Sequence, residues 1–178
     1  MKNLTPSDIC AIILASGKGT RFGIPKSEAM VDGLLFSQMI SRSLLETGIR
    51  NIVLAKDLET SSMLESLRRS IADIKGVFSH YLIWPVDHPF VHGSTLDILV
   101  ESAVQNPDCI IKPEYLGRRG HPIIIPRNLD IQNPVYETLR EILRYSGVGS
   151  VIVAVDDPGI MQNVNTLEDL NRFTDKGY

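Results

Sequence analysis

Uninterrupted apolar runs alternate along the chain with stretches in which apolar residues recur at helical spacing. Residues 9–15 form a continuous apolar run, which is typical of a strand buried on both faces of a sheet. Further strands are predicted at residues 51–55, 81–86, 109–112, 123–125 and 150–155. Pro122 and Pro126 flank the run at 123–125 and confine it to a short or edge strand.

Five helices are predicted between and after these strands. Phe36, Ile40 and Leu44 recur one turn apart and indicate a helix over residues 37–47 that stops at Gly48. The second helix follows a capping-box pattern at 62–65 and ends near Gly76, with Met63, Leu67, Ile71 and Ile74 inward. The third begins at a second such pattern, at 94–97, and runs through Ala103 and Val104. The fourth begins at Pro134, with Leu139, Ile142 and Leu143 inward, and the final helix is capped by Thr166 and Asp169.

The alternation of strands and helices predicts the α/β class, as a three-layer α/β/α, Rossmann-like architecture with a mostly parallel open sheet. No repeat, linker or low-complexity tract interrupts the 178 residues, so we expect one domain over residues 1–178. In such sheets, ligands bind beyond the carboxyl ends of the strands. The loops that follow residues 15, 86 and 155 are therefore expected to meet.

Composition narrows the class of partner. Hydrophobic residues make up 43% of the chain and charged residues 22%, as in folded globular proteins. The formal net charge of -3 provides no long-range attraction to nucleic acid or to an anionic membrane. Cys10 and Cys109 are not spaced as metal ligands, and we expect core thiols in a reducing compartment. With neither a leader-like segment nor a membrane-length apolar run, the predicted location is cytoplasmic.

The densest chemistry follows the first predicted strand, where residues 14–26 contain three glycines and three cations in the string LASGKGTRFGIPK. Glycines let main-chain N–H groups approach an anion closely, and the cations add charge to those donors. The spacing is not that of a P-loop, and as a dinucleotide fingerprint its third glycine comes one residue late. The alternative is a plain turn with solvated cations.

This string resembles the signature of nucleotidyltransferases related to molybdenum cofactor cytidylyltransferase and molybdopterin guanylyltransferase, the MobA-like family with a nucleotide-diphospho-sugar transferase-like fold. The resemblance implies that the turn at 14–17 lies against the base, that the glycines and Arg21 hold the triphosphate, and that Lys26 neutralises the transferred phosphate. The implied nucleotide-binding residues are Leu14, Ala15, Ser16, Gly17, Lys18, Gly19, Thr20, Arg21, Lys26 and Ser62.

Asp87 ends the predicted strand at 81–86, within the string PVDHPFV. A carboxylate at that position suits Mg²⁺, which prefers hard oxygen ligands and takes the rest from triphosphate oxygens and water. The family resemblance implies the same role, since an Asp in an Asp-x-Pro setting is its metal ligand. The alternative is a cap for the helix near Gly93. His88 either contacts a substrate phosphate or is only a packed residue.

Two further segments resemble the family. The string YLGRRGHP is similar to one on the acceptor side of the cytidylyltransferase branch, so Arg118 and Arg119 are expected to bind an anionic acceptor. His121 is expected there as a loop-shaping hydrogen-bond partner rather than a base. In the closing segment, Asn163 and Asn165 replace two aspartates of the family pattern.

Asn165 has two alternative roles. Its side-chain oxygen can serve Mg²⁺ beside Asp87, or the residue belongs to the entry of the final helix.

The chain also passes almost directly from residue 55 to residue 63, where the family normally carries another strand. This difference leaves the choice of base open.

Together these residues predict a Mg²⁺-dependent nucleotidyltransferase. It would transfer a nucleoside monophosphate from a nucleoside triphosphate, CTP or GTP, to a phosphorylated acceptor such as molybdopterin, releasing pyrophosphate. The expected catalytic residues are Lys26, Arg21 and Asp87. Two alternatives remain: transfer to a sugar or polyol phosphate by a cytidylyl- or uridylyltransferase, and a non-catalytic nucleotide-binding regulatory protein.

Overall fold

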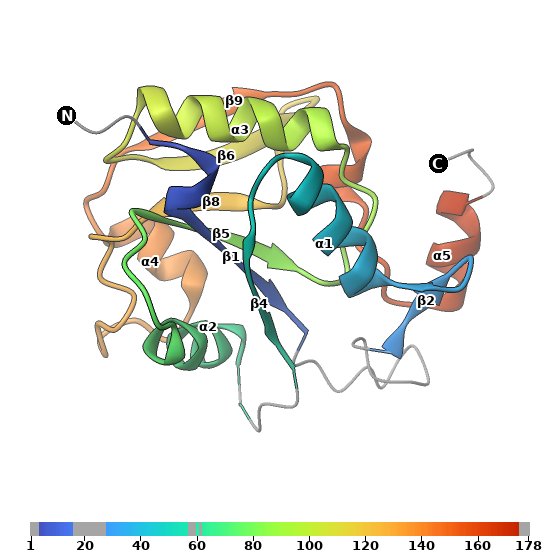
Figure 1. The fold of residues 1–178 in the computed structure, drawn as a ribbon, viewed down its shortest axis with the longest axis horizontal. Coiled ribbons are helices and arrows are strands. Elements are labelled where there is room, and N and C mark those ends of the chain that lie inside the picture. Colours follow the sequence, from blue (N-terminus) through green and yellow to red (C-terminus); the bar gives the residue numbers. More distant parts are fainter. Residues whose placement is uncertain (1–3, 16–27, 57–59, 61, 175–178) are drawn as a thin grey trace.

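The computed structural model describes residues 4–15, 28–56, 60 and 62–174, and contains one large sheet and one small one. The large sheet has seven strands in the order β4-β1-β5-β8-β6-β7, and β9 pairs with β6 (Figure 1). Its strands are β1 (Ile9–Leu14), β4 (Asn51–Ala55), β5 (His80–Pro85), β6 (Ile110–Tyr115), β7 (Arg118–Arg119), β8 (Ile123–Pro126) and β9 (Ser150–Ala154). The small sheet is an antiparallel pair, β2 (Met30–Val31) and β3 (Leu34–Leu35).

The longest pairings in the large sheet are parallel, which confirms the predicted α/β class with a mostly parallel sheet. β1 is parallel to both β4 and β5, and β6 is parallel to β9. β8 is antiparallel to β5 and β6 and lies between them, so of the two expectations for this strand the short one is confirmed and the edge position is wrong. The two prolines stand before this strand and at its last residue, and the three isoleucines between them keep their amide donors for pairing.

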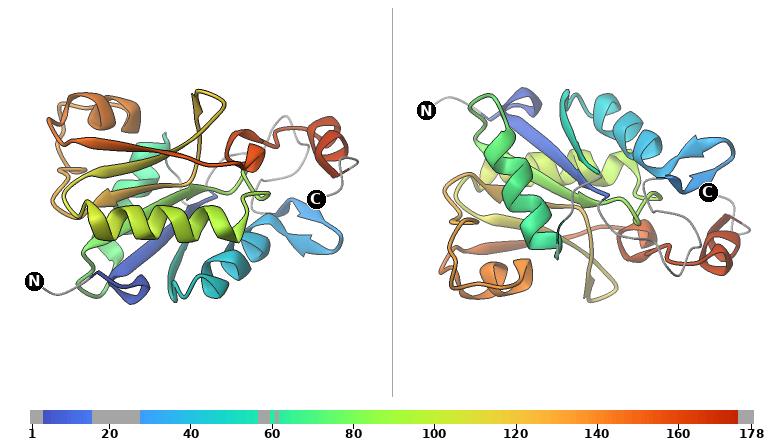
Figure 2. Two further views of the ribbon diagram at one scale, coloured as in Figure 1. Left: turned by 90° about the horizontal axis from the view of Figure 1, so that it is seen from above. Right: turned by 90° about the horizontal axis from the view of Figure 1, so that it is seen from below.

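The described residues form five α-helices, four of which pack on the two faces of the large sheet, while the last lies beyond the strand ends (Figure 1). They are α1 (Phe36–Glu46), α2 (Met63–Asp73), α3 (Gly93–Gln105), α4 (Leu139–Tyr145) and α5 (Leu167–Thr174). Figure 2 shows α3 over one face and α2 over the other. Short 3-10 helices, η1 (Pro6–Asp8) and η3 (Pro158–Met161), complete the elements. No helix in the described part of the chain is both long and apolar enough to cross a membrane.

The hydrophobic core lies in two layers separated by the sheet. Successive β1 side chains alternate between them: Ile9, Ala11 and Ile13 face α1 and α3, whereas the residues between them face α2 and α4. Every β1 residue is buried, so the predicted strand with two covered faces is confirmed. Because both faces of the central strands are covered, polar ligands can reach this sheet only at its edges and strand ends.

Two predicted helix starts are wrong, for different reasons. α4 begins at Leu139 and not at Pro134, because Thr138 and Glu141 form the capping box that starts it. α3 begins at Gly93, one residue before the expected Ser94 cap, and a carboxylate from a distant segment serves its N-terminus.

The predicted inward face of α2 is partly wrong. Leu64 and Leu67 are buried against the sheet, while Met63 is 46% exposed. Ser62 accepts a hydrogen bond from the Glu65 backbone N–H, which confirms the expected N-cap. The helix is therefore rotated relative to the face inferred from the spacing of its apolar residues.

Candidate active site

The segments after β5 and β9 meet at the carboxyl end of β1, as predicted for these two loops, whereas the loop after β1 lies outside the described residues beyond Ala15. The Val86 N–H donates to the Leu14 carbonyl (3.0 Å), which joins the segments after β5 and β1. The Val164 N–H donates to the Asp87 carbonyl (2.8 Å), which brings the segment after β9 to the same place. The end of β1 and the segment after β9 therefore both lie beside the turn that carries Asp87.

Asp87 lies in the turn that follows β5, with its side chain only 13% exposed. His88 Nδ1 is 3.0 Å from Asp87 Oδ1, a distance at which the imidazole N–H donates to the carboxylate. The Trp84 indole N–H donates to the His88 carbonyl (2.9 Å) and fixes the backbone of this turn. The carboxylate is therefore held at the end of the central strand where ligands of such sheets bind.

His121 lies against this turn from the other side. Its ring centroid is 5.2 Å from that of His88, in an edge-on arrangement with an interplanar angle of 61°. Burial and the nearby His88 lower the pKa of His121 to about 4, although Asp87 opposes this shift. The imidazole is therefore neutral near pH 7. Its Nδ1 is buried and has no hydrogen-bond partner among the described residues.

Arg118 and Arg119 are more exposed to solvent than His121. Both form β7, the exposed second strand of a hairpin with β6, whereas His121, two residues later, is partly buried. A side chain at Gly120 would collide with the Ile160 carbonyl, so the string YLGRRGHP needs its second glycine where the hairpin passes η3. The structure brings His88 and His121 together and leaves the two arginines on the surface.

Sequence reasoning missed Asp157, which organises the floor of this region. Its carboxylate is buried and accepts hydrogen bonds from the His92 N–H (2.9 Å), the Thr95 hydroxyl (2.7 Å) and the Gly159 N–H (2.8 Å). Asp157, rather than Asp87, serves the N-terminus of α3. The Asp-Pro-Gly sequence after a predicted strand was the available signal, but its partners are 62 and 65 residues away.

Asn165 belongs to the entry of α5, one of its two expected roles. Its backbone N–H and that of Thr166 both donate to Asp169 Oδ2 (3.0 Å each), and the Asp169 N–H donates back to the Thr166 hydroxyl. The predicted capping box is confirmed. Because the adjacent Val164 is bonded to Asp87, Asn165 also lies in the segment beside the carboxylate, and its role toward a metal stays a prediction.

The glycine-rich loop is described only at its first two residues. Leu14 ends β1, and Ala15 donates its N–H to the Ala55 carbonyl (2.9 Å). The other predicted nucleotide-binding residues of this loop lie outside the described residues: Ser16, Gly17, Lys18, Gly19, Thr20, Arg21 and Lys26. Ser62 is described and serves as the N-cap of α2.

The donors at this site suit Mg²⁺ only when a ligand completes its coordination. Among the described residues there is no group of three or more His, Cys, Asp or Glu that could hold a metal ion. Asp87 and Asn165 offer hard oxygen atoms from adjacent segments, and Mg²⁺ commonly takes one or two protein oxygens plus phosphate oxygens. The residues present therefore fit a metal-bound triphosphate rather than a metal held by protein alone.

The fold and the converging strand ends define a nucleotidyltransferase-like α/β domain. The model of the MobA-like NTP transferase domain matches residues 53–156, and the chain belongs to this family. The chain is also 27% identical to a probable molybdenum cofactor guanylyltransferase of Bacillus cereus (strain Q1), with 76% of each chain covered. The family resemblance inferred from the glycine-rich string is confirmed.

Solved structures confirm the predicted nucleotide-diphospho-sugar transferase-like fold. One is CMP:2-keto-3-deoxy-manno-octonic acid synthetase complexed with CTP, with a TM-score of 0.74, 12% identity, and coverage of 96% of this chain and 99% of that one. Another is Rv0371C of Mycobacterium tuberculosis H37Rv complexed with manganese, with a TM-score of 0.62, 16% identity, and coverage of 96% and 100%. At these identities the likeness establishes the fold alone.

Proposed function

We propose that this chain transfers a nucleoside monophosphate from a nucleoside triphosphate to a phosphorylated acceptor and releases pyrophosphate. The observation that carries the proposal is the convergence beside Asp87 of the end of β1 and the segments after β5 and β9, through the Val86–Leu14 and Val164–Asp87 hydrogen bonds. A triphosphate held by the loop after β1 would then extend along the turn that carries the carboxylate.

The proposed reaction is an in-line displacement at the α-phosphorus. An oxygen of the acceptor phosphate forms the new bond, and the bond to the oxygen bridging the α- and β-phosphates breaks, so pyrophosphate leaves with the electron pair. No nucleophilic side chain is required, because positioning and spread positive charge lower the barrier. In this proposal Arg21 holds the leaving pyrophosphate and Lys26 neutralises the transferred phosphate.

Asp87 and Asn165 are the proposed ligands of Mg²⁺. Bound there, the ion would supply positive charge to the triphosphate. His88 Nδ1, 3.0 Å from Asp87 Oδ1, would hold the carboxylate in place for this role. Rv0371C, which has a similar fold, was solved in complex with manganese, and this supports a divalent metal in the proposal.

The proposed nucleotide is CTP or GTP, and the proposed acceptor is molybdopterin or a similar phosphorylated molecule. The relative named as a molybdenum cofactor guanylyltransferase and the related fold solved with CTP support this range. His88, His121, Arg118 and Arg119 are the proposed acceptor-binding residues. The neutral His121, whose Nδ1 is buried, suits a hydrogen bond to the acceptor better than a role as a cation.

Pyrophosphate release across a panel of nucleoside triphosphates and phosphorylated acceptors, with and without Mg²⁺, tests this proposal. Asp87→Asn keeps the shape of the side chain and removes its charge, so we expect turnover to fall by about 10²–10³-fold, the scale seen when one electrostatic group is lost. Asp97→Asn, which removes an exposed carboxylate from the solvent face of α3, is the matched control and should leave the rate unchanged.

Two results would count against the proposal. An Asp87→Asn variant as active as the wild type would remove Asp87 from the mechanism. If triphosphates with Mg²⁺ raise the melting temperature but no acceptor yields pyrophosphate, the chain is a nucleotide-binding protein without turnover.

A further inference from the structure

The η3 segment, residues 157–164, lies between two other parts of the candidate site. One part is the turn that carries Asp87, and the other is the loop that carries His121. The Val164 N–H donates to the Asp87 carbonyl (2.8 Å). The Ile160 carbonyl accepts a hydrogen bond from the His121 N–H (3.0 Å). The η3 segment therefore joins the proposed metal side of the site to its proposed acceptor side.

Two glycines allow the backbone of the η3 segment to lie against both of these parts. A side chain at Gly159 would collide with the Phe90 carbonyl, just after the turn that carries Asp87. A side chain at Gly120 would collide with the Ile160 carbonyl on the acceptor side. Only glycine leaves room for so close an approach. Because main-chain atoms make both contacts, no change of side-chain rotamer can alter the spacing that they set.

Asp157 fixes the start of the η3 segment. Its side chain is 1% exposed, and its Oδ1 accepts a hydrogen bond from the Gly159 N–H (2.8 Å). Its Oδ2 accepts hydrogen bonds from the His92 N–H (2.9 Å) and the Thr95 hydroxyl (2.7 Å). One oxygen therefore holds the η3 segment and the other holds the start of α3, the helix that follows the Asp87 turn in the chain.

We propose that Asp157 is a positioning residue that, through the η3 segment, sets the spacing between Asp87 and His121. The inference rests on the proposed function, because it takes Asp87 as the metal side and His121 as the acceptor side. Asp157 itself contacts neither substrate and acts through Ile160 and Val164. In-line transfer requires aligned reactants, and a misplacement of about 1 Å can cost about 10²-fold in rate.

The two sides of the site should respond differently when the η3 segment is loosened. The turn that carries Asp87 has two further anchors, since the Trp84 indole N–H donates to its backbone and the Val86 N–H donates to the end of β1. The His121 N–H is held by the Ile160 carbonyl of the η3 segment itself. Loosening should therefore displace the acceptor side more than the metal side.

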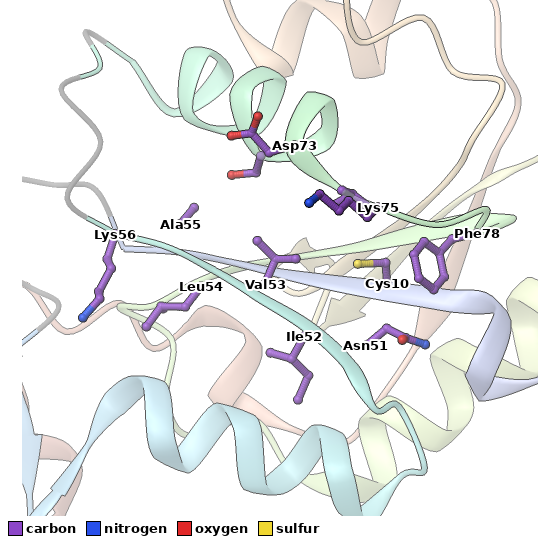
Figure 3. A pocket seen from close by; sticks show the side chains of 12 residues that line it. Cys10, Asn51, Ile52, Val53, Leu54, Ala55, Lys56, Asp73, Lys75 and Phe78 are labelled. Atoms are coloured by element: carbon purple, nitrogen blue, oxygen red, sulfur yellow. The ribbon is translucent and has the colours of Figure 1, made fainter.

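Asp157→Asn tests this difference, because the amide keeps one acceptor oxygen and loses the other. We expect kcat to fall by about 10–10²-fold and the KM of the acceptor to rise, while the affinity for a nucleoside triphosphate with Mg²⁺ stays unchanged. Asp73→Asn is the matched control and should keep all three values. Asp73 lies at a hollow of about 400 Å³ between β4 and α2, whose described lining includes no residue of the η3 segment (Figure 3).

Gly120→Ala tests the contact from its other side. The added Cβ would collide with the Ile160 carbonyl and push the acceptor side away from the η3 segment. The same pattern is expected, with kcat lower by about 10²-fold and triphosphate affinity retained. Gly93→Ala, whose Cβ meets nothing within 4 Å, is the matched control. Circular dichroism checks the folding of each variant, and Asp157→Asn decides the question if Gly120→Ala does not fold.

Histidine NMR signals test the positioning without any turnover. The chain has four histidines, and the rings of His88 and His121 lie 5.2 Å apart, so the signals of each ring depend on the place of the other. Single His→Gln variants assign them. Both η3 variants should shift the signals of His88 and His121 and leave those of His80, at the other end of β5, in place. The two control variants should shift none of these three.

The outcomes separate this inference from the proposed function. A wild-type chain that releases no pyrophosphate with any acceptor would count against the proposed function, and the ring signals would still test the positioning. Folded Asp157→Asn and Gly120→Ala variants with unchanged ring signals, or with wild-type kcat and acceptor KM, would overturn the inference. A loss of triphosphate affinity as large as the loss of kcat would also overturn it, because Asp157 would then act on the nucleotide side.

Discussion

Removal of the Asp157 carboxylate should destabilise the protein more than any other single loss of charge described above. The carboxylate is 1% exposed and accepts three hydrogen bonds, from His92, Thr95 and Gly159. These bonds tie the segment after β9 to the start of α3. Asp157→Ala leaves the donors without their acceptor in a buried region, where water replaces it poorly.

The expected loss follows from this geometry. Removing one partner from a buried charged network typically costs about 3–5 kcal/mol, and we expect Asp157→Ala to lie in that range. For a chain of this size the melting temperature should fall by about 6–20 °C. Asp157→Asn keeps one acceptor oxygen and should lose about 1–3 kcal/mol.

Denaturant unfolding followed by tryptophan fluorescence measures this loss directly. Trp84 is the one tryptophan of the sequence, is fully buried, and bonds to the His88 carbonyl, so its emission reports on the core beside the site. Asp97→Asn is again the exposed control. A double-mutant cycle with Thr95→Val should give a coupling energy of about 0.5–3 kcal/mol. An Asp157→Ala variant within about 1 kcal/mol of the wild type would refute the argument.

Three further predictions concern single positions. A side chain at Gly159 would collide with the Phe90 carbonyl, so Gly159→Ala should cost at least about 1–3 kcal/mol in denaturant unfolding, whereas Gly93→Ala, which meets nothing within 4 Å, should not destabilise. Burial raises the pKa of the Cys10 thiol from 9.0 to about 11, so the unfolded state loses its proton first and stability falls as the pH rises from 9 to 11. Cys10→Ala should remove that pH-dependent loss, about 3 kcal/mol in total, and an unchanged pH profile of unfolding would contradict the prediction. Ser62→Ala should lower stability by about 1 kcal/mol through the lost N-cap, and an additional loss of nucleotide affinity in a binding titration would show the second role that the family resemblance implies.

The elements themselves were predictable because their signals are local. β1, β4, β5 and β9 lie within one residue at each end of their apolar runs, and α1 within one residue of its predicted helix. Asp87 was identifiable because a carboxylate directly after a buried strand of a parallel sheet occupies the end where ligands bind. The glycine-rich string identified the family, which the family model and the Bacillus relative confirm.

The sequence by itself thus determined three features: the periodicity of apolar residues, the caps at Thr166 and Ser62, and the carboxylate after β5. Each depends on residues within a few positions of one another. Tertiary structure alone decided the rest. Strand order and partners far apart in the chain decide the interior place of β8, the contact of His88 with His121, the bonds that Asp157 makes to α3 and the place of β4 at the end of the strand order. Local patterns cannot encode these, because they record which face of an element is buried and not what buries it.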